Sequence, residues 1–153
     1  MVYLLDNPIR HHAWGSVSAI PELLGMPATG EPHAELWLGG YEGSASIART
    51  VTGRVPLDEL VRRDPVGALG VDVVDVLGSR LPYLMKVLAV ERPLSIQAHP
   101  TTEQAEAGYA AENDAGVPLD AFERSYRDPY HKPEFVVALS EFTALLGFRI
   151  PTE

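Results

Sequence analysis

The chain has 153 residues, the length of one ordinary domain, which is enough to bury a substantial core without covalent cross-links. It contains no cysteine, which excludes a thiolate nucleophile, a disulfide framework and a cysteine-based zinc site, and fits a reducing compartment. Lys and Arg number 12 and Asp and Glu 21, so the formal charge of -9 argues against a nucleic acid partner. No apolar stretch approaches the ~20 residues of a membrane-spanning helix, so we expect a cytoplasmic protein with no membrane partner.

Turn residues and apolar periodicity predict short elements in the first part of the chain. Residues 71–77 fit either a helix or a strand. The other expected elements are strands at 2–5, 34–40, 46–51 and 81–90, one helical turn at 20–24, and helices at 57–63 and 65–69.

Residues 94–100, LSIQAHP, are the most informative stretch. As a β-strand, this stretch would place Ser95, Gln97 and His99 on one face and apolar side chains on the other. It therefore predicts a strand with one polar face that is able to bind a metal ion and one face that packs into a core.

The segment after this strand is predicted to be helical. Thr101 and Gln104 have the spacing of a capping box, a helix should continue through 105–113, and Gly116 should end it. His99 would then lie where a strand ends just before a helix begins, a common place for functional groups. A further short helix is expected at 118–126.

A second candidate ligand comes from the HKPE sequence, where Glu134 opens an apolar run, 135–139, with the pattern of a strand. Gln97, His99 and Glu134 form a nitrogen and oxygen ligand set with one negative charge, so a bound divalent ion would stay positive and could polarise a substrate oxygen. A lone histidine is more often a hydrogen-bonded structural residue, and the spacing alone leaves both interpretations open. Lys132 would share the strand face of Glu134 and could supply a cation to an oxyanion or a phosphate.

Two other polar positions lie in predicted strands. Glu35 and Trp37 share one face of the strand at 34–40, which fits either a sugar site or, as the more frequent case, a solvated face with an amphipathic tryptophan. Lys86 interrupts the apolar run 81–90. It is either a lysine on an edge strand, with its amine in solvent, or a cation held inside a pocket.

The expected strands number about seven, and the helices are inserted among them without regular alternation. This pattern argues against a doubly wound sheet. It favours a mainly β fold with inserted helices, arranged as an antiparallel sandwich or barrel.

Several segments resemble type I mannose-6-phosphate isomerases, also called phosphomannose isomerases. The likeness runs in order along essentially the whole chain, and SIQAHP together with HKPE is far more specific than either motif alone. HAWG at 12–15 is similar to the start of the family's sequences. The other matching segments are AELWLGG at 34–40, LPYLMKVLAVERPLSIQAHP at 81–100 and DPYHKPEFVVALSEFTALLGFR at 128–149.

This resemblance implies a cupin-type jelly roll and a zinc-dependent isomerase that interconverts mannose 6-phosphate and fructose 6-phosphate through an enediol. It implies one zinc ion per chain, held by Gln97, His99 and Glu134, and a small-molecule sugar phosphate as the substrate. It also implies catalytic roles for Lys132, Lys86, Ser95 and Glu35, and a place for Trp14 in the wall of the substrate pocket.

Members of that family are considerably longer than this chain. We therefore expect residues 1–153 to be the N-terminal part of the cupin-type catalytic domain, without the family's helical insertion, its C-terminal jelly roll and its fourth zinc ligand, a histidine. A jelly roll interrupted there would leave open strand edges, so self-association is expected. The alternative function is a non-catalytic cupin-like module that binds a metal ion or a sugar phosphate.

Overall fold

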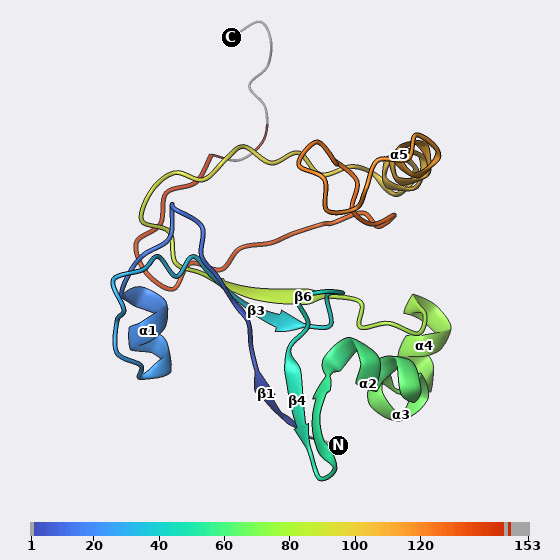
Figure 1. The fold of residues 1–153 in the computed structure, drawn as a ribbon, viewed down its shortest axis with the longest axis horizontal. Coiled ribbons are helices and arrows are strands. Elements are labelled where there is room, and N and C mark those ends of the chain that lie inside the picture. The colour runs from blue at the N-terminus through green and yellow to red at the C-terminus, as the bar shows by residue number, and fades with distance from the viewer. Residues whose placement is uncertain (1, 146, 148–153) are drawn as a thin grey trace, which may run out of the picture. The chain divides into compact units, whose positions relative to one another are not determined.

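The structure is a computed structural model that describes residues 2–145 and 147 (Figure 1). It divides into two compact units, one up to Ser95 and one from Ile96 onward. The first unit contains the strands and four of the helices of the described chain, and the second contains the remaining helix.

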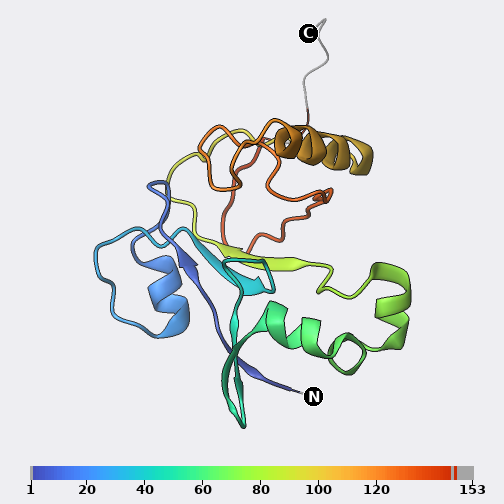
Figure 2. The same ribbon diagram turned by 45° about the vertical axis from the view of Figure 1, so that its right-hand side comes forward.

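Two antiparallel sheets of three strands form the framework of the first unit. The strand order in the first sheet is β1 (Leu4–Asp6), β4 (Ile47–Thr50), β5 (Gly53–Pro56), and in the second sheet it is β2 (Ile9–Arg10), β3 (Glu35–Gly39), β6 (Leu84–Leu88). In the second sheet β3 therefore pairs with β2 on one side and with β6 on the other, and Figures 1 and 2 show β3 and β6 side by side.

The core of this unit forms where helix α1 (Ala19–Leu24) meets the second sheet. Ile20 is fully buried and packs with Leu36 of β3 and with Ala89, which follows β6. Each fully buried Ile or Leu side chain contributes ~1.5–3 kcal/mol to folding, so this contact anchors α1. The helix ends at Gly25, whose φ of 63° lies in the left-handed region that glycine adopts without strain.

Three further helices, α2 (Leu57–Arg63), α3 (Pro65–Leu69) and α4 (Val71–Leu77), follow β5. Figures 1 and 2 both place them at the opposite end of the unit from α1. Asp64 caps α3 by accepting a hydrogen bond from the backbone N–H of Gly67 at 2.9 Å. Residues 71–77, whose pattern fitted either a helix or a strand, form helix α4. The predicted helices at 57–63 and 65–69 are confirmed.

The second unit is built on helix α5 (Thr102–Asp114). The predicted capping box is confirmed: the Thr101 hydroxyl accepts from the N–H of Gln104 at 3.3 Å, and the Gln104 side chain accepts from the N–H of Thr101 at 3.0 Å. No described helix in either unit is long and apolar enough to cross a membrane.

Three elements predicted for the second half are wrong. Residues 94–100 and 135–139 are not strands, and 118–126 is made of turns instead of a helix. An extended segment becomes a strand only when a neighbouring strand accepts its backbone hydrogen bonds, and within residues 2–145 and 147 neither segment has such a neighbour. Ile96 and Phe135 are consequently 96% and 89% exposed. The sequence has a final apolar run at 142–150, and it lies partly outside the described residues.

Gly15 provides a test of close packing in the first unit. A Cβ atom at this position would lie 2.5 Å from the Cα atom of Ala34, so Gly15→Ala should force the backbone apart and lower the free energy of unfolding by ~1–3 kcal/mol. The matched control is Gly39→Ala, where the new Cβ atom would meet the flexible end of Leu84 at 2.9 Å. Urea denaturation should show a clearly smaller loss for Gly39→Ala, and equal losses would contradict the packing argument.

Asp6 gives the first sheet a pH dependence. Hydrogen bonds from Arg49, and then the charges of Arg49 and Arg54, hold the pKa of the Asp6 carboxyl below its ordinary value. A lowered folded-state pKa stabilises the protein above the unfolded-state pKa, and the benefit is lost as the pH falls through the folded-state value. Thermal melts of the wild type and Asp6→Asn should therefore differ most near neutral pH and converge in acid. A constant difference would contradict this assignment.

Candidate functional site

Five side chains gather on one face of the second sheet, and we call them the Glu35 cluster. Strand register places Arg10 opposite Glu35 and Lys86 opposite Trp37. Pairing therefore brings polar residues from three strands together, although they are distant in the sequence. The members are Arg10, His12, Glu35, Trp37 and Lys86.

The Glu35 carboxylate is the centre of this cluster. It accepts a hydrogen bond from the indole Nε1 of Trp37 at 2.6 Å, and Lys86 Nζ lies 3.7 Å from its other oxygen. His12 Nε2 is 3.9 Å away. The residue is only 8% exposed, so the interpretation of Glu35 as part of a solvated face is wrong.

The Trp37 ring is flanked by two cations. The Arg10 guanidinium lies 5.1 Å and Lys86 Nζ 4.7 Å from the ring centroid, within the range of cation–π attraction. β6 is an edge strand, as one interpretation of Lys86 required, yet its amine is paired and its side chain is 32% exposed. An aromatic ring beside two cations can pack on the apolar side of a ligand and attract an anionic group.

Arg10 and His12 were not among the predicted site residues. Arg10 belongs to a strand of two residues, which is too short for side-chain periodicity to reveal. Trp14, which was predicted in a pocket wall, stacks on His12 with ring centroids 5.5 Å apart. The HAWG motif was a signal for this region, but nothing in its spacing identified the contact with Glu35.

In the second unit, His99 and Glu134 come together. His99 Nε2 lies 3.7 Å from Glu134 Oε1, which is too long for a hydrogen bond. Two ligands of one tetrahedral zinc ion, each ~2.1 Å from the metal, lie about 3.4 Å apart. The separation of this His99–Glu134 pair is within ion-pair distance and is also close to the separation of two ligands of one metal ion.

Gln97 is exposed in the same extended segment as His99, and it makes no hydrogen bond within the described part of the chain. No group of three His, Cys, Asp or Glu side chains that could hold a metal is present among residues 2–145 and 147. The predicted zinc ligands are one histidine, one glutamate and the amide of Gln97, so they would not form a group of three such side chains.

A hollow of about 370 Å³ lies beside His99 in the second unit. Lys132 lines it, with Nζ 2.9 Å from Asp128 Oδ2, and the other Asp128 oxygen accepts from the N–H of Tyr130 at 3.1 Å. The aspartate thus holds the lysine at the wall. Tyr126 also lines the hollow.

The eight predicted site residues divide between the units. The structure brings Glu35 and Lys86 together in the first unit, and His99 and Glu134 in the second. Ser95 is exposed at the end of the first unit. The full division is Trp14, Glu35, Lys86 and Ser95 in the first unit, and Gln97, His99, Lys132 and Glu134 in the second.

The family model for the phosphomannose isomerase type I catalytic domain matches residues 2–151. The chain belongs to this family. It is 45% identical over 147 residues to the mannose-6-phosphate isomerase of Escherichia coli (strain K12), covering 95% of this chain and 37% of the relative. The corresponding Homo sapiens enzyme is 35% identical over 158 residues, covering 97% of this chain and 35% of the relative.

A solved structure gives the same family. Mannose 6-phosphate isomerase from Salmonella typhimurium, bound to its substrate (f6p) and zinc, superposes with a TM-score of 0.75 and 42% identity. The match covers 85% of this chain and 33% of the other. The chain thus spans little more than a third of the length of the curated relatives it matches.

The hydrogen bond between Trp37 and Glu35 can be tested by substitution. Trp37→Phe keeps a ring but removes the donor to a buried carboxylate, so the free energy of unfolding should fall by ~1.5–3 kcal/mol. In the Glu35→Gln background the same change should cost less, because the acceptor is uncharged. Urea denaturation of the four chains measures the coupling. Equal losses in both backgrounds would mean that lost packing alone explains the effect.

Proposed function

We propose that this chain is the N-terminal part of the catalytic domain of a zinc-dependent mannose-6-phosphate isomerase, which interconverts mannose 6-phosphate and fructose 6-phosphate through an enediol. The observation that carries the proposal is the approach of His99 to Glu134, two residues from separate motifs of the family. Their separation of 3.7 Å supports a shared metal ion.

The fold that belongs to this proposal is a cupin-like jelly roll, present here only in part. The antiparallel register of both three-stranded sheets supports it. The family's helical insertion and C-terminal jelly roll would lie beyond residues 1–153. The absence of cysteine supports a cytoplasmic location.

Zinc would be held by Gln97, His99 and Glu134. When bound, the ion would supply Lewis-acid polarisation of a sugar oxygen, because one anionic ligand leaves it with net positive charge. His99 is well suited to a ligand role, since it lies only two residues before Thr101, the capping residue of α5, and so next to a regular element.

Isomerisation moves a proton between C2 and C1 of the sugar, and it needs a base, a proton donor and stabilisation of developing charge. We propose catalytic roles for Glu35, Lys86, Ser95 and Lys132. Glu35 is a carboxylate shielded from water, and the lysine amines are held by Glu35 and Asp128 at positions where they can attract a phosphate or an oxyanion. Trp14 would contribute to the wall of the substrate pocket.

Self-association is also proposed, through the extended segment that contains Phe135, Val137 and Leu139. These side chains are 89%, 68% and 84% exposed, a larger apolar row than a soluble monomer usually presents. Light scattering over a wide concentration range tests this, and a constant monomer mass would count against it.

Metal content and turnover together test the proposed function. The wild type should bind about one zinc ion per chain, and His99→Ala and Glu134→Gln should weaken zinc binding by at least ~10-fold. His11→Ala is a matched histidine control in the other unit and should leave zinc binding unchanged.

The outcomes separate the two candidate functions. Zinc-dependent turnover of mannose 6-phosphate, lost in the ligand variants, supports the isomerase. Zinc binding without turnover supports the non-catalytic binding module. A wild type that takes up no zinc on titration contradicts both the metal site and the isomerase proposal for this chain.

A further inference from the structure

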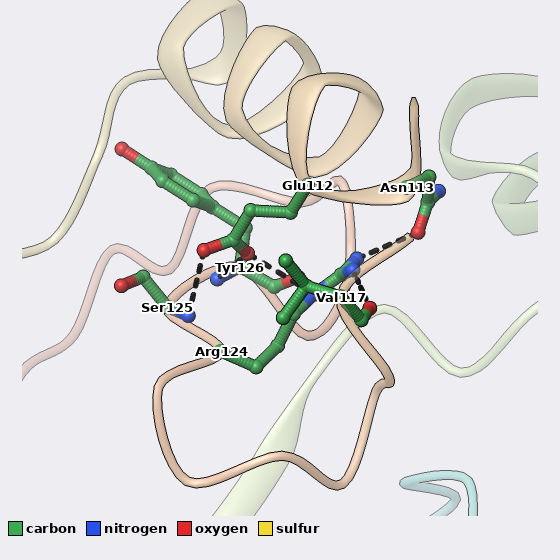
Figure 3. A network of polar contacts seen from close by, with 6 residues as sticks. All are labelled: Glu112, Asn113, Val117, Arg124, Ser125 and Tyr126. Atoms are coloured by element: carbon green, nitrogen blue, oxygen red, sulfur yellow. Dashed lines mark hydrogen bonds and ion pairs between the residues drawn. The ribbon is translucent and has the colours of Figure 1, made fainter. Parts of the chain in front are cut away.

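The chain reverses its direction after α5, and a network of polar contacts fixes the reversal (Figure 3). Glu112 and Asn113 come from the last turn of the helix, and the remaining members come from the turns that follow it. In place of the helix predicted for 118–126, the backbone N–H groups of Ser125 and Tyr126 donate to Glu112 of α5. The members that follow the helix are Val117, Arg124, Ser125 and Tyr126.

Arg124 is the centre of the network. Its side chain is 0% exposed, which is rare for arginine. Nε donates to the carbonyl of Tyr126 at 2.7 Å, Nη1 to the carbonyl of Val117 at 2.7 Å and Nη2 to Asn113 Oδ1 at 2.8 Å. Because the guanidinium is planar and its donors are fixed in a fork, these three partners are held in one geometry.

Glu112 completes the network from the helix. One carboxylate oxygen accepts from the N–H of Ser125 at 3.0 Å, and the other accepts from the N–H of Tyr126 at 2.8 Å and lies 3.0 Å from Arg124 Nε. These backbone hydrogen bonds first, and then the charge of Arg124, hold the pKa of Glu112 below its ordinary value. Two charged side chains thus join the helix to the segment after it: Glu112 of the helix accepts from the backbone of 125–126, and Arg124 of the segment donates to Asn113 of the helix.

Packing fixes the same segment. The ring of Tyr126 lies directly on the helix at Gly108, where a Cβ atom would be 2.5 Å from the ring. Ser125 and Tyr126 line the same hollow as His99 and Lys132. The network therefore determines one wall of this hollow.

The position of α5 connects the network to the His99–Glu134 pair. His99 lies just before the capped start of the helix, and the Arg124 network lies at its end. After Tyr126, the last member of the network, the chain runs back towards His99. Within eight residues it places Lys132 in the wall of the same hollow and Glu134 beside His99. The placement of Glu134 relative to His99 thus depends on the contacts by which the Arg124 network fixes the change of chain direction after α5.

We propose that Arg124 is a positioning residue for the candidate metal site: through Glu112, Asn113 and Tyr126 it sets the return of the chain, and so brings Glu134 to His99. The identity of the metal rests on the proposed function, whereas the positioning role does not. A purely structural role, in which Arg124 only stabilises the end of α5, is the competing explanation.

The test uses Arg124→Lys, which keeps the charge but loses the fork, and Asn113→Ala, which removes one partner and introduces a better helix former. Arg127→Lys is the matched control, because Arg127 is exposed. Zinc affinity should fall ~10-fold or more in Arg124→Lys, less in Asn113→Ala, and stay within about twofold in the control. Circular dichroism at the assay temperature checks that each variant is folded.

A second readout does not need a metal. The chain has no cysteine, so His99→Cys combined with Glu134→Cys introduces a single thiol pair. Its equilibrium with oxidised and reduced glutathione measures the effective concentration of one thiol at the other, which should fall about tenfold when Arg124→Lys is added and should not change with Arg127→Lys.

Thiol pairing unchanged by Arg124→Lys would overturn the proposal, even if the variant melts at a lower temperature, and so would unchanged zinc affinity. If Arg124→Lys is unfolded, Asn113→Ala decides by the same two measurements. A wild type that binds no zinc would contradict the proposed function alone, because the thiol pair would still decide the role of Arg124.

Discussion

Antiparallel pairing on both sides of β3 is the interaction on which the first unit depends. The alternation of side chains along this strand divides its residues between two tasks: Leu36 packs against Ile20 in the core, while Glu35 and Trp37 meet cations from the neighbouring strands. A shift of the register by one residue would exchange the two faces. The Glu35 cluster therefore exists because the same register also buries the core.

The second unit depends less on apolar burial. In α5, Ala105 is the buried apolar residue, and the helix is joined to the chain after it mainly by Arg124, Glu112 and the ring of Tyr126. Charged hydrogen bonds in a shielded place are directional, so they specify one arrangement of the segment where apolar contacts would tolerate several. Such specificity is what a site assembled from separated motifs requires.

Local signals in the sequence were sufficient for much of the fold. The capping box at Thr101, the Asp64 cap and the alternation around Leu36 each act within a few residues, and each is present in the structure. The predicted strands at 94–100 and 135–139 failed because a strand requires a partner, which is a property of the whole sheet and not of a local pattern. The site followed the same rule: the His99 and Glu134 motifs were recognisable, whereas the arginine contact with Trp37 and the buried Arg124 depend on tertiary placement.

The position of the two tryptophans has a consequence for experiments. Trp14 and Trp37 are the only ones in the sequence, and both lie in the first unit, beside His12 and Glu35 respectively. Intrinsic tryptophan fluorescence will therefore report on the first unit and on ligands that approach the Glu35 cluster, while the second unit, with its helix, dominates neither the emission nor its quenching. Tryptophan emission thus follows the first unit alone, whereas helical circular dichroism reports on both units, because α1 to α4 lie in the first and α5 in the second.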